Sequence, residues 1–321
     1  MVHPPPAVRH VAIDEASEAQ RLDNFLLKTL KSAPKSLVYR IVREGQVRIN
    51  GKRAQVSDKL ALGDDVRIPP VWLDEVAAKG VPKSAVAKGA SFEILFEDDA
   101  LLAIHKPAGV AVHGGSGINF GVIEQLRAAR QPKFLELVHR LDRDTSGVLL
   151  LAKKRSALVA MHELLRNGQT DKRYQVLVHG IWPHPPNQAH HVRETLHKYV
   201  TDGGERRVAT VVDPEDGKES HTIFRLMASN GQRGDYALLE AQLLTGRTHQ
   251  IRVHLMSQGF PIVGDDKYGD FALNKRLAKA GFKRMFLHAA KLSFIHPLTA
   301  QRLTLLAPLP RECTLFLESL A

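Results

Sequence analysis

Residues 138–152 read VHRLDRDTSGVLLLA, and this stretch carries the strongest chemical signal in the chain. Two acids, two arginines, a Thr-Ser pair and a glycine come directly before an apolar run that predicts a strand. Functional side chains are often held on loops that rigid elements position. We therefore expect residues 139–147 to form a functional loop beside a strand.

Asp142 is the candidate reactive group of this loop. Arg140 and Arg143 lie close to it in the sequence, and nearby positive charge favours the ionised carboxylate. An ionised carboxylate in a cleft can act as a covalent nucleophile. A turn aspartate can instead simply accept hydrogen bonds from backbone amides, and local composition leaves the two interpretations equal.

Two later segments carry further candidates. Tyr174 lies at the start of a predicted strand, where its ring could stack on a nucleobase or simply pack half-buried. The string GRTHQIRVH, residues 246–254, opens a predicted helix. One face of that helix carries Arg247 and another carries Arg252, and either could bring an arginine to a carboxylate or to phosphate.

The catalytic candidates lie in a region of interleaved strands and helices that begins at Phe92. Eight segments predict strands and four predict helices, without strict alternation. We expect an α+β fold with a mixed, mainly antiparallel sheet and packed helices rather than a doubly wound parallel sheet. Residues 182–220 are polar and predict a long loop. Their histidines lack metal-ligand spacing, so no metal site is expected: His184, His190, His191 and His197.

Positive charge is concentrated near the amino terminus. The chain has a net charge of +11, and residues 21–53 contribute +7, from nine basic and two acidic residues. This concentration predicts a polyanionic partner, with RNA or DNA ahead of a membrane surface. Apolar residues at helical spacing predict two helices, and Asn50-Gly51 predicts a hairpin turn between short strands.

Length and composition set the remaining limits. The chain has 321 residues, 44% hydrophobic and 25% charged, which is typical of a globular protein of about two domains. We expect no transmembrane helix and no signal peptide. The single cysteine, Cys313, excludes an internal disulfide and Cys-rich metal sites, and favours the cytoplasm. The expected organisation is a tail over 1–20, a small domain over 21–68, a linker over 69–90 and a catalytic domain over 91–321.

The string RLDNFLLKTL…SLVYRIVREGQVRINGKRA…LGDDVRI in the small domain resembles the S-four RNA-binding domain. The resemblance implies that the second helix and the hairpin face the phosphates of structured RNA. The residues expected to contact RNA are Arg21, Lys35, Arg40, Arg43, Arg48, Lys52 and Arg53.

The string HRLDRDTSG resembles the signature of the pseudouridine synthases that modify uridines in ribosomal and transfer RNA. Further matches follow in order: LAIHKPAG, VHGGSG, the Lys172–Tyr174 pair, GRTHQIRVH, GFPIVGDDKYGD and LHAAKLSFIHP. The resemblance spans about 95–308, is strongest to the large-subunit ribosomal enzymes, and implies the pseudouridine synthase fold.

The resemblance implies a role for each matching residue. Asp142 is the nucleophile, Tyr174 stacks on the uracil, Arg252 pairs with Asp142, and Arg140 fills the space left by a flipped uridine. The implied reaction is an isomerisation that needs no cofactor and no metal. The implied partner is 23S ribosomal RNA, with no membrane or protein partner, and a monomer is expected.

Two other function classes are compatible with parts of the sequence. A haloacid-dehalogenase-type phosphatase would use Asp142 and Asp144, with Asp265 and Asp270 on Mg²⁺, but Ser146 stands where its motif requires Thr or Val. A non-catalytic RNA-binding or ribosome-assembly protein would need only the small domain. Dependence on Mg²⁺ and turnover on RNA separate these alternatives from a synthase.

Overall fold

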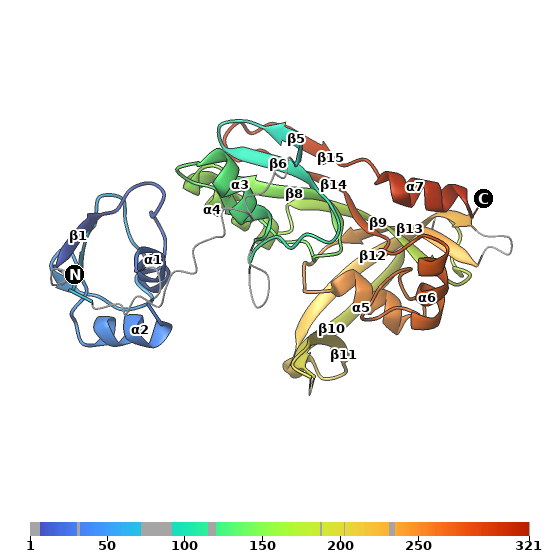
Figure 1. The fold of residues 1–321 in the computed structure, drawn as a ribbon, viewed down its shortest axis with the longest axis horizontal. Helices are drawn as coiled ribbons and strands as arrows, with labels where there is room; N and C mark the ends of the chain where they lie inside the picture. The colour runs from blue at the N-terminus through green and yellow to red at the C-terminus, as the bar shows by residue number, and fades with distance from the viewer. Residues whose placement is uncertain are drawn as a thin grey trace. The chain divides into compact units, whose positions relative to one another are not determined.

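The computed structural model describes residues 7–30, 33–71, 92–114, 120–186, 188–201, 203–230 and 235–320. These residues form two compact units, one built around the chain up to Ala90 and one from Ser91 onward (Figure 1). Most of the expected linker over 69–90 lies outside the described residues. So do the start of the expected tail, residues 1–6, and residues 115–117 of the VHGGSG string.

The first unit is a small antiparallel sheet with two helices. The strand order is β1-β4-β2-β3. Both helices turn apolar residues inward, so that Leu22, Leu26, Val38 and Val42 are buried with Val66 of the sheet. The elements are β1 (Arg9–Ala12), α1 (Leu22–Thr29), α2 (Lys35–Arg43), β2 (Arg48–Ile49), β3 (Lys52–Arg53) and β4 (Asp65–Ile68).

The predicted hairpin turn is confirmed, because Asn50 and Gly51 have φ angles of 51° and 76° and join β2 to β3. Two consecutive positive φ angles are the requirement of a type I′ turn. Residues 9–12 lie within the tail expected over 1–20, but they are structured. They form β1, which pairs with β4, and Ile13 directly after it is buried in the core of the unit.

The second unit is built on one long sheet. In the described residues its strands follow the order β11-β10-β12-β13-β9-β14-β8-β6-β5, with β15 on β14 and β7 on β8. Among the described strands only β14 and β8 run parallel, so the predicted mixed, mainly antiparallel α+β fold is confirmed. The strands are β5 (Glu93–Glu97), β6 (Leu101–Lys106), β7 (Glu136–Leu137), β8 (Ser146–Ala152), β9 (Thr170–His179), β10 (His190–Val200), β11 (Arg206–Val211), β12 (Lys218–Asn230), β13 (Tyr236–Leu243), β14 (Leu287–Ile295) and β15 (Arg302–Leu306).

Helices pack on this sheet and complete its core. Val253 of α5 lies in a buried cluster with Leu196 of β10 and Val208 of β11. Leu273 of α6 and Cys313 of α7 share another cluster that reaches β9 and β13. The helices are α3 (Val122–Arg130), α4 (Arg155–Arg166), α5 (Gln250–Ser257), α6 (Phe271–Lys279) and α7 (Arg311–Glu318), with a short 3₁₀ turn, η1, at Pro214–Asp216.

The prediction of a long loop over 182–220 is wrong. The segment contains β10, β11, η1 and the start of β12, and α6 is a further element that the sequence pattern did not predict. In β10 only Val192 and Leu196 are buried, and the remaining residues are polar apart from the exposed Tyr199 and Val200 at its end. A strand that buries every fourth residue has too weak an alternation to be recognised in sequence.

Gly147 allows β8 and β14 to approach each other. Its φ angle is +117°, and a Cβ atom there would lie 2.2 Å from the carbonyl oxygen of Ala289. No side chain fits this space, and positive φ adds backbone strain for any other residue. The glycine therefore fixes the parallel contact that follows the 139–146 loop.

Replacing Gly147 with Ala should destabilise the protein by about 3 kcal/mol or more, because steric overlap adds to backbone strain. Gly168→Ala is the matched control, since Gly168 also has positive φ (+69°) but open space around its Cα. The free energy of unfolding of that variant should fall by only about 1–2 kcal/mol. Urea unfolding of both variants measures the difference, and equal losses would contradict the steric argument.

Candidate active site

The loop that carries Asp142 is anchored directly after that residue by a buried lysine. Lys106, at the end of β6, is fully buried, and its Nζ donates hydrogen bonds to the carbonyl oxygens of Pro107 (2.8 Å), Val110 (2.7 Å) and Arg143 (2.9 Å). Within the loop, the Thr145 backbone N–H donates to the Asp142 carbonyl oxygen (3.2 Å). The loop is therefore tied to β6 one residue after Asp142.

The carboxyl-terminal end of the loop is anchored by Ser146, the first residue of β8. The Nε2–H of buried His288 donates to the carbonyl oxygen of Ala307 (3.1 Å), which leaves Nδ1 to accept from the Ser146 hydroxyl (2.9 Å). The same hydroxyl oxygen accepts a hydrogen bond from Arg284 Nη2 (2.6 Å). These bonds explain the Thr-Ser-Gly sequence: Ser146 bonds β14, and Gly147 leaves room for it.

Asp142 is joined to α5 by an arginine. Arg252 Nη1 lies 3.3 Å from Asp142 Oδ2. The Asp142 side chain is 28% exposed, whereas that of Arg252 is 4% exposed. The carboxylate is thus held from within the protein and is open on its other side, as a nucleophile must be. The alternative that Asp142 only caps a turn does not account for this ion pair.

Arg252 is itself fixed by a buried carboxylate. Its Nε and Nη2 atoms each lie 2.7 Å from an oxygen of Asp265, whose side chain is 1% exposed. Asp265 also accepts hydrogen bonds from the backbone N–H groups of Lys267 and Tyr268. The guanidinium lies over the Tyr268 ring, 5.0 Å from its centre. Bidentate pairing of this kind sets the plane of the guanidinium as well as its charge.

Electrostatics keep this group charged. Burial alone would lower the pKa of Arg252, but the hydrogen bonds and negative charge of Asp265, with the charge of Asp142, raise it above its ordinary value. Burial likewise acts to raise the pKa of Asp265, and Arg252 with the two backbone N–H groups lowers it overall. A permanent positive charge therefore faces Asp142.

His249 approaches Asp142 from the residue that precedes α5. The Tyr268 hydroxyl oxygen accepts a hydrogen bond from the Val208 backbone N–H (2.9 Å), and the same hydroxyl is hydrogen-bonded to His249 Nδ1 (2.8 Å). His249 Nε2 lies 3.9 Å from Asp142 Oδ2. Burial lowers the pKa of His249, opposed by the charge of Asp142. His249 has φ 53° and ψ 19°, a strained conformation that commonly marks functional sites.

Tyr174 lies on β9, paired with Ala241 of β13, and is 8% exposed. Burial, with the nearby charge of Asp142, raises the pKa of the Tyr174 hydroxyl. The phenol therefore stays protonated near neutral pH, and the influence of the Asp142 charge on it shows that the two side chains are near each other.

The two arginine-bearing faces of the 246–254 string take different positions. Arg252 reaches Asp142, whereas Arg247 Nε donates to the Glu219 carbonyl oxygen (3.1 Å). Arg140 is exposed, and among the described residues its guanidinium has no hydrogen-bond or ion-pair partner. It is thus free to meet a ligand beside Asp142.

The expected RNA-contacting residues of the first unit are all exposed. Arg21, however, is engaged by Asp23 through two hydrogen bonds of 3.1 and 2.7 Å, and Arg53 donates to the Arg43 carbonyl oxygen (2.7 Å). Arg48 Nη1 donates to the Gly51 carbonyl oxygen (3.2 Å). Among the described residues, no hydrogen-bond or ion-pair partner engages the side chains of Lys35, Arg40 and Arg43 on α2 or of Lys52 in the hairpin.

Comparison with known proteins adds to this geometry. A family model for RNA pseudouridylate synthase matches residues 100–257, and one for the S4 domain matches residues 20–66. The ribosomal large subunit pseudouridine synthase C of Salmonella typhi is 48% identical over 98% of this chain and 97% of its own. The chain belongs to the RNA pseudouridylate synthase family. It is an RNA pseudouridine synthase, and the resemblance expected from HRLDRDTSG is confirmed.

Other relatives support the same assignment. The synthase C of Haemophilus influenzae is 47% identical over 98% of this chain and 95% of its own. Among solved structures, human RNA pseudouridylate synthase domain containing 4 is 28% identical, with a TM-score of 0.57 over 71% of this chain and 92% of that protein.

The structure also bears on the phosphatase alternative. Asp265, a metal ligand in the phosphatase hypothesis, is occupied by Arg252, and Asp270 accepts from the Leu273 N–H at the start of α6. No group of three or more His, Cys, Asp or Glu in the described part of the chain is arranged to hold a metal ion. In the same residues, no helix is long and apolar enough to cross a membrane.

Sequence reasoning missed four residues that build the site: Lys106, His249, Asp265 and Tyr268. Each lies inside a string that was recognised, namely LAIHKPAG, GRTHQIRVH or GFPIVGDDKYGD. The strings show that these residues matter, but only the packing of β6, α5 and the Asp265 turn around Asp142 shows what they contact.

Replacing Lys106 with Met should change the pH dependence of stability. Burial lowers the pKa of Lys106 from 10.5 to about 7, against the pull of Asp144 and Asp142. Between these values the unfolded chain binds a proton that the folded chain lacks, so stability should rise with pH. Relative to Lys106→Met, the wild type should gain up to about 1.4 kcal/mol per pH unit. Urea unfolding at pH 7, 8 and 9 tests this, and parallel pH curves would show that Lys106 stays charged.

Proposed function

We propose that this synthase isomerises uridines of large-subunit (23S) ribosomal RNA, with Asp142 as the nucleophile. The observation that carries the chemistry is the Asp142 carboxylate, part-exposed and paired at 3.3 Å with a buried arginine. The substrate class is supported by relatives, 47–48% identical over nearly the whole chain, that are named ribosomal large subunit pseudouridine synthase C.

The reaction requires only groups that can remain in one pocket. Asp142 attacks the target nucleoside at the ribose glycosidic carbon or at carbon 6 of the uracil. The bond from nitrogen 1 to the ribose breaks, the base turns, carbon 5 bonds to the ribose, and the bond to Asp142 breaks, which returns the free carboxylate. The proton leaves carbon 5, and nitrogen 1 regains a proton, so that no atom is gained or lost. Arg252 keeps the carboxylate charged and oriented before the attack and again after its release.

Two further residues contribute binding rather than bond making. The Tyr174 ring stacks on the extruded uracil, which restores part of the stacking lost when the base leaves the helix. Arg140, exposed and unpaired among the described residues, occupies the space that the uridine vacates. Base extrusion costs a few kcal/mol, and these contacts offset it.

The first unit anchors the RNA through its phosphates. The +7 charge of residues 21–53 supports this role, and the exposed cations of α2 and the hairpin supply the contacts. Phosphate contacts hold the enzyme on RNA without selecting a sequence. We also propose that the protein acts as a monomer in the cytoplasm and needs no cofactor or protein partner.

Asp142→Asn should abolish pseudouridine formation and leave RNA binding unchanged, because the amide keeps the shape of the side chain but cannot attack. Pseudouridine mapping in 23S RNA compares cells without the gene, cells complemented with wild type, and cells carrying Asp142→Asn. Specific positions should be lost in the deletion and restored only by wild type. Restoration by Asp142→Asn would exclude it as nucleophile, and an unchanged 23S map in the deletion would exclude this substrate.

Replacing Tyr174 separates its ring from its hydroxyl. Tyr174→Phe should bind RNA as the wild type does, because the stacking surface remains, whereas Tyr174→Ala should lose roughly 1–3 kcal/mol of binding free energy. Fluorescence anisotropy measures binding, and single-turnover assays measure chemistry. A Phe variant that binds normally but is as inactive as Asp142→Asn would contradict a role limited to stacking.

A further inference from the structure

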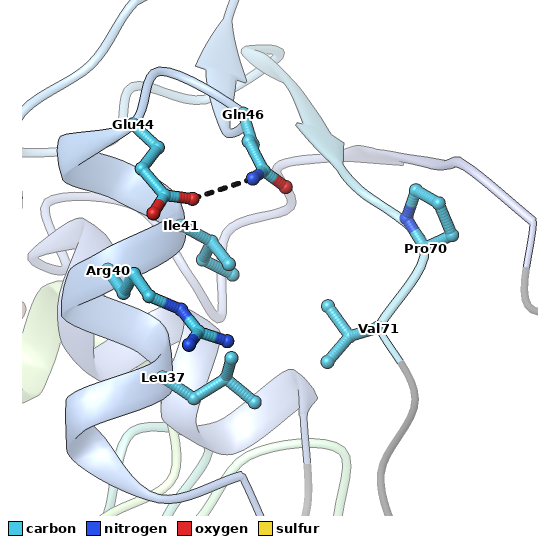
Figure 2. A pocket seen from close by; sticks show the side chains of 7 residues that line it. All are labelled: Leu37, Arg40, Ile41, Glu44, Gln46, Pro70 and Val71. Carbon is cyan, nitrogen blue, oxygen red and sulfur yellow. Dashed lines mark hydrogen bonds between the residues drawn. The ribbon is translucent and has the colours of Figure 1, made fainter.

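The first unit contains a pocket of about 340 Å³ between α2 and the chain that follows β4. Figure 2 shows the Arg40 guanidinium and the Leu37 side chain directed toward the space bounded by Pro70 and Val71. Ile41 lies between these walls, and Glu44 and Gln46 close one end. Its volume is within the range that holds a small flat ligand.

The polar groups of the pocket are unusual for a surface that binds phosphate. Arg40 and Glu44 are four residues apart and share a helix face, but no ion pair joins them. Glu44 Oε2 instead accepts a hydrogen bond from Gln46 Nε2 (2.7 Å). Among the described residues, Glu44 Oε1 and the Arg40 guanidinium have no partner. A carboxylate on an RNA-binding face repels phosphate, whereas it favours a ligand group that donates hydrogen bonds.

We propose that this pocket binds one unpaired guanine base of the RNA. This inference rests on the proposed RNA substrate and adds a site of base recognition to the first unit. A carboxylate with one oxygen free can accept two further hydrogen bonds side by side. Guanine alone among the four bases presents two adjacent donors, N1–H and N2–H, on its Watson–Crick edge, and single-stranded bases are read on that edge.

The remaining walls suit the rest of the base. Leu37, Ile41, Pro70 and Val71 supply apolar surface for the faces of a flat ring. The Arg40 guanidinium can stack on the ring or donate to its O6 atom, and both are favourable for a cation beside a purine. The +7 charge of residues 21–53 draws the RNA backbone to the same unit.

Removing the charge of Glu44 should change RNA affinity in opposite directions under the two interpretations of this face. If the face binds only phosphates, Glu44→Gln removes a repulsive charge and tightens binding to every RNA. If Glu44 pairs with guanine, the same change weakens binding. Glu15→Gln is the matched control, because Glu15 is exposed, lies outside the pocket and makes no contact among the described residues.

The experiment uses the full-length protein and synthetic RNA hairpins that differ only in one bulged nucleotide: guanosine, inosine, adenosine or uridine. Fluorescence anisotropy should show wild type preferring the guanosine bulge by about 5- to 100-fold over adenosine and uridine, with inosine, which lacks N2, in between. Glu44→Gln should remove that preference without changing the salt dependence of binding. Arg40→Lys should weaken guanosine binding while keeping the charge.

Two results would overturn the inference. One is that the wild type binds the four hairpins equally, and the other is that Glu44→Gln tightens RNA binding as much as Glu15→Gln does. The Asp142→Asn protein should keep the guanosine preference although it is inactive. A protein that forms pseudouridine but shows no preference would refute only this inference. A protein that shows the preference but forms no pseudouridine in 23S RNA would refute only the proposed function.

Discussion

The pairing of Arg252 with Asp265 is the interaction on which the site depends. Both side chains are almost completely buried, and removing one partner of such a pair commonly costs about 3–5 kcal/mol because the other charge is left unpaired. The pair does not exist mainly for stability, since apolar residues could fill the same space at little or no cost. It holds a positive charge, fixed in direction, against the reactive carboxylate of Asp142.

The surrounding structure holds that geometry from several directions. Lys106 fixes the Asp142 loop to β6 at Arg143, Ser146 fixes its carboxyl-terminal end to β14, and Gly147 allows β14 to come close enough. Tyr268 supports both Arg252 and His249. The reacting groups thus lie on segments whose own positions are determined by buried hydrogen bonds, which is the condition for oriented catalysis.

The proposed function divides RNA recognition between the two units. Uridine chemistry needs an extruded base and a rigid pocket, whereas holding a large RNA needs exposed charge spread over a surface. Under this proposal the second unit meets the first requirement, and the exposed cations of α2 and the hairpin meet the second. A base pocket beside Arg40 and Glu44 would add selectivity to a unit whose other proposed contacts are with phosphates.

The sequence by itself determined the fold class and the basic first unit with its Asn50-Gly51 turn, and it predicted Asp142, Tyr174 and Arg252 as candidate site residues. These follow from local patterns, because apolar periodicity, turn residues and motif strings are written in neighbouring positions. It did not reveal β1 or β10 and β11, since short or mostly polar strands are stabilised by partners distant in the chain.

Only the tertiary structure decided which arginine of the 246–254 string faces Asp142. Helical spacing allowed Arg247 or Arg252, and the choice depends on how α5 packs against β10–β12. The roles of Lys106, Asp265 and His249 depend likewise on contacts between residues that are far apart in the chain. Arg252 and Asp265 are 13 residues apart, and Asp142 and Arg252 are 110 residues apart. No local pattern encodes such a distance, because it is set by the register and packing of the whole sheet.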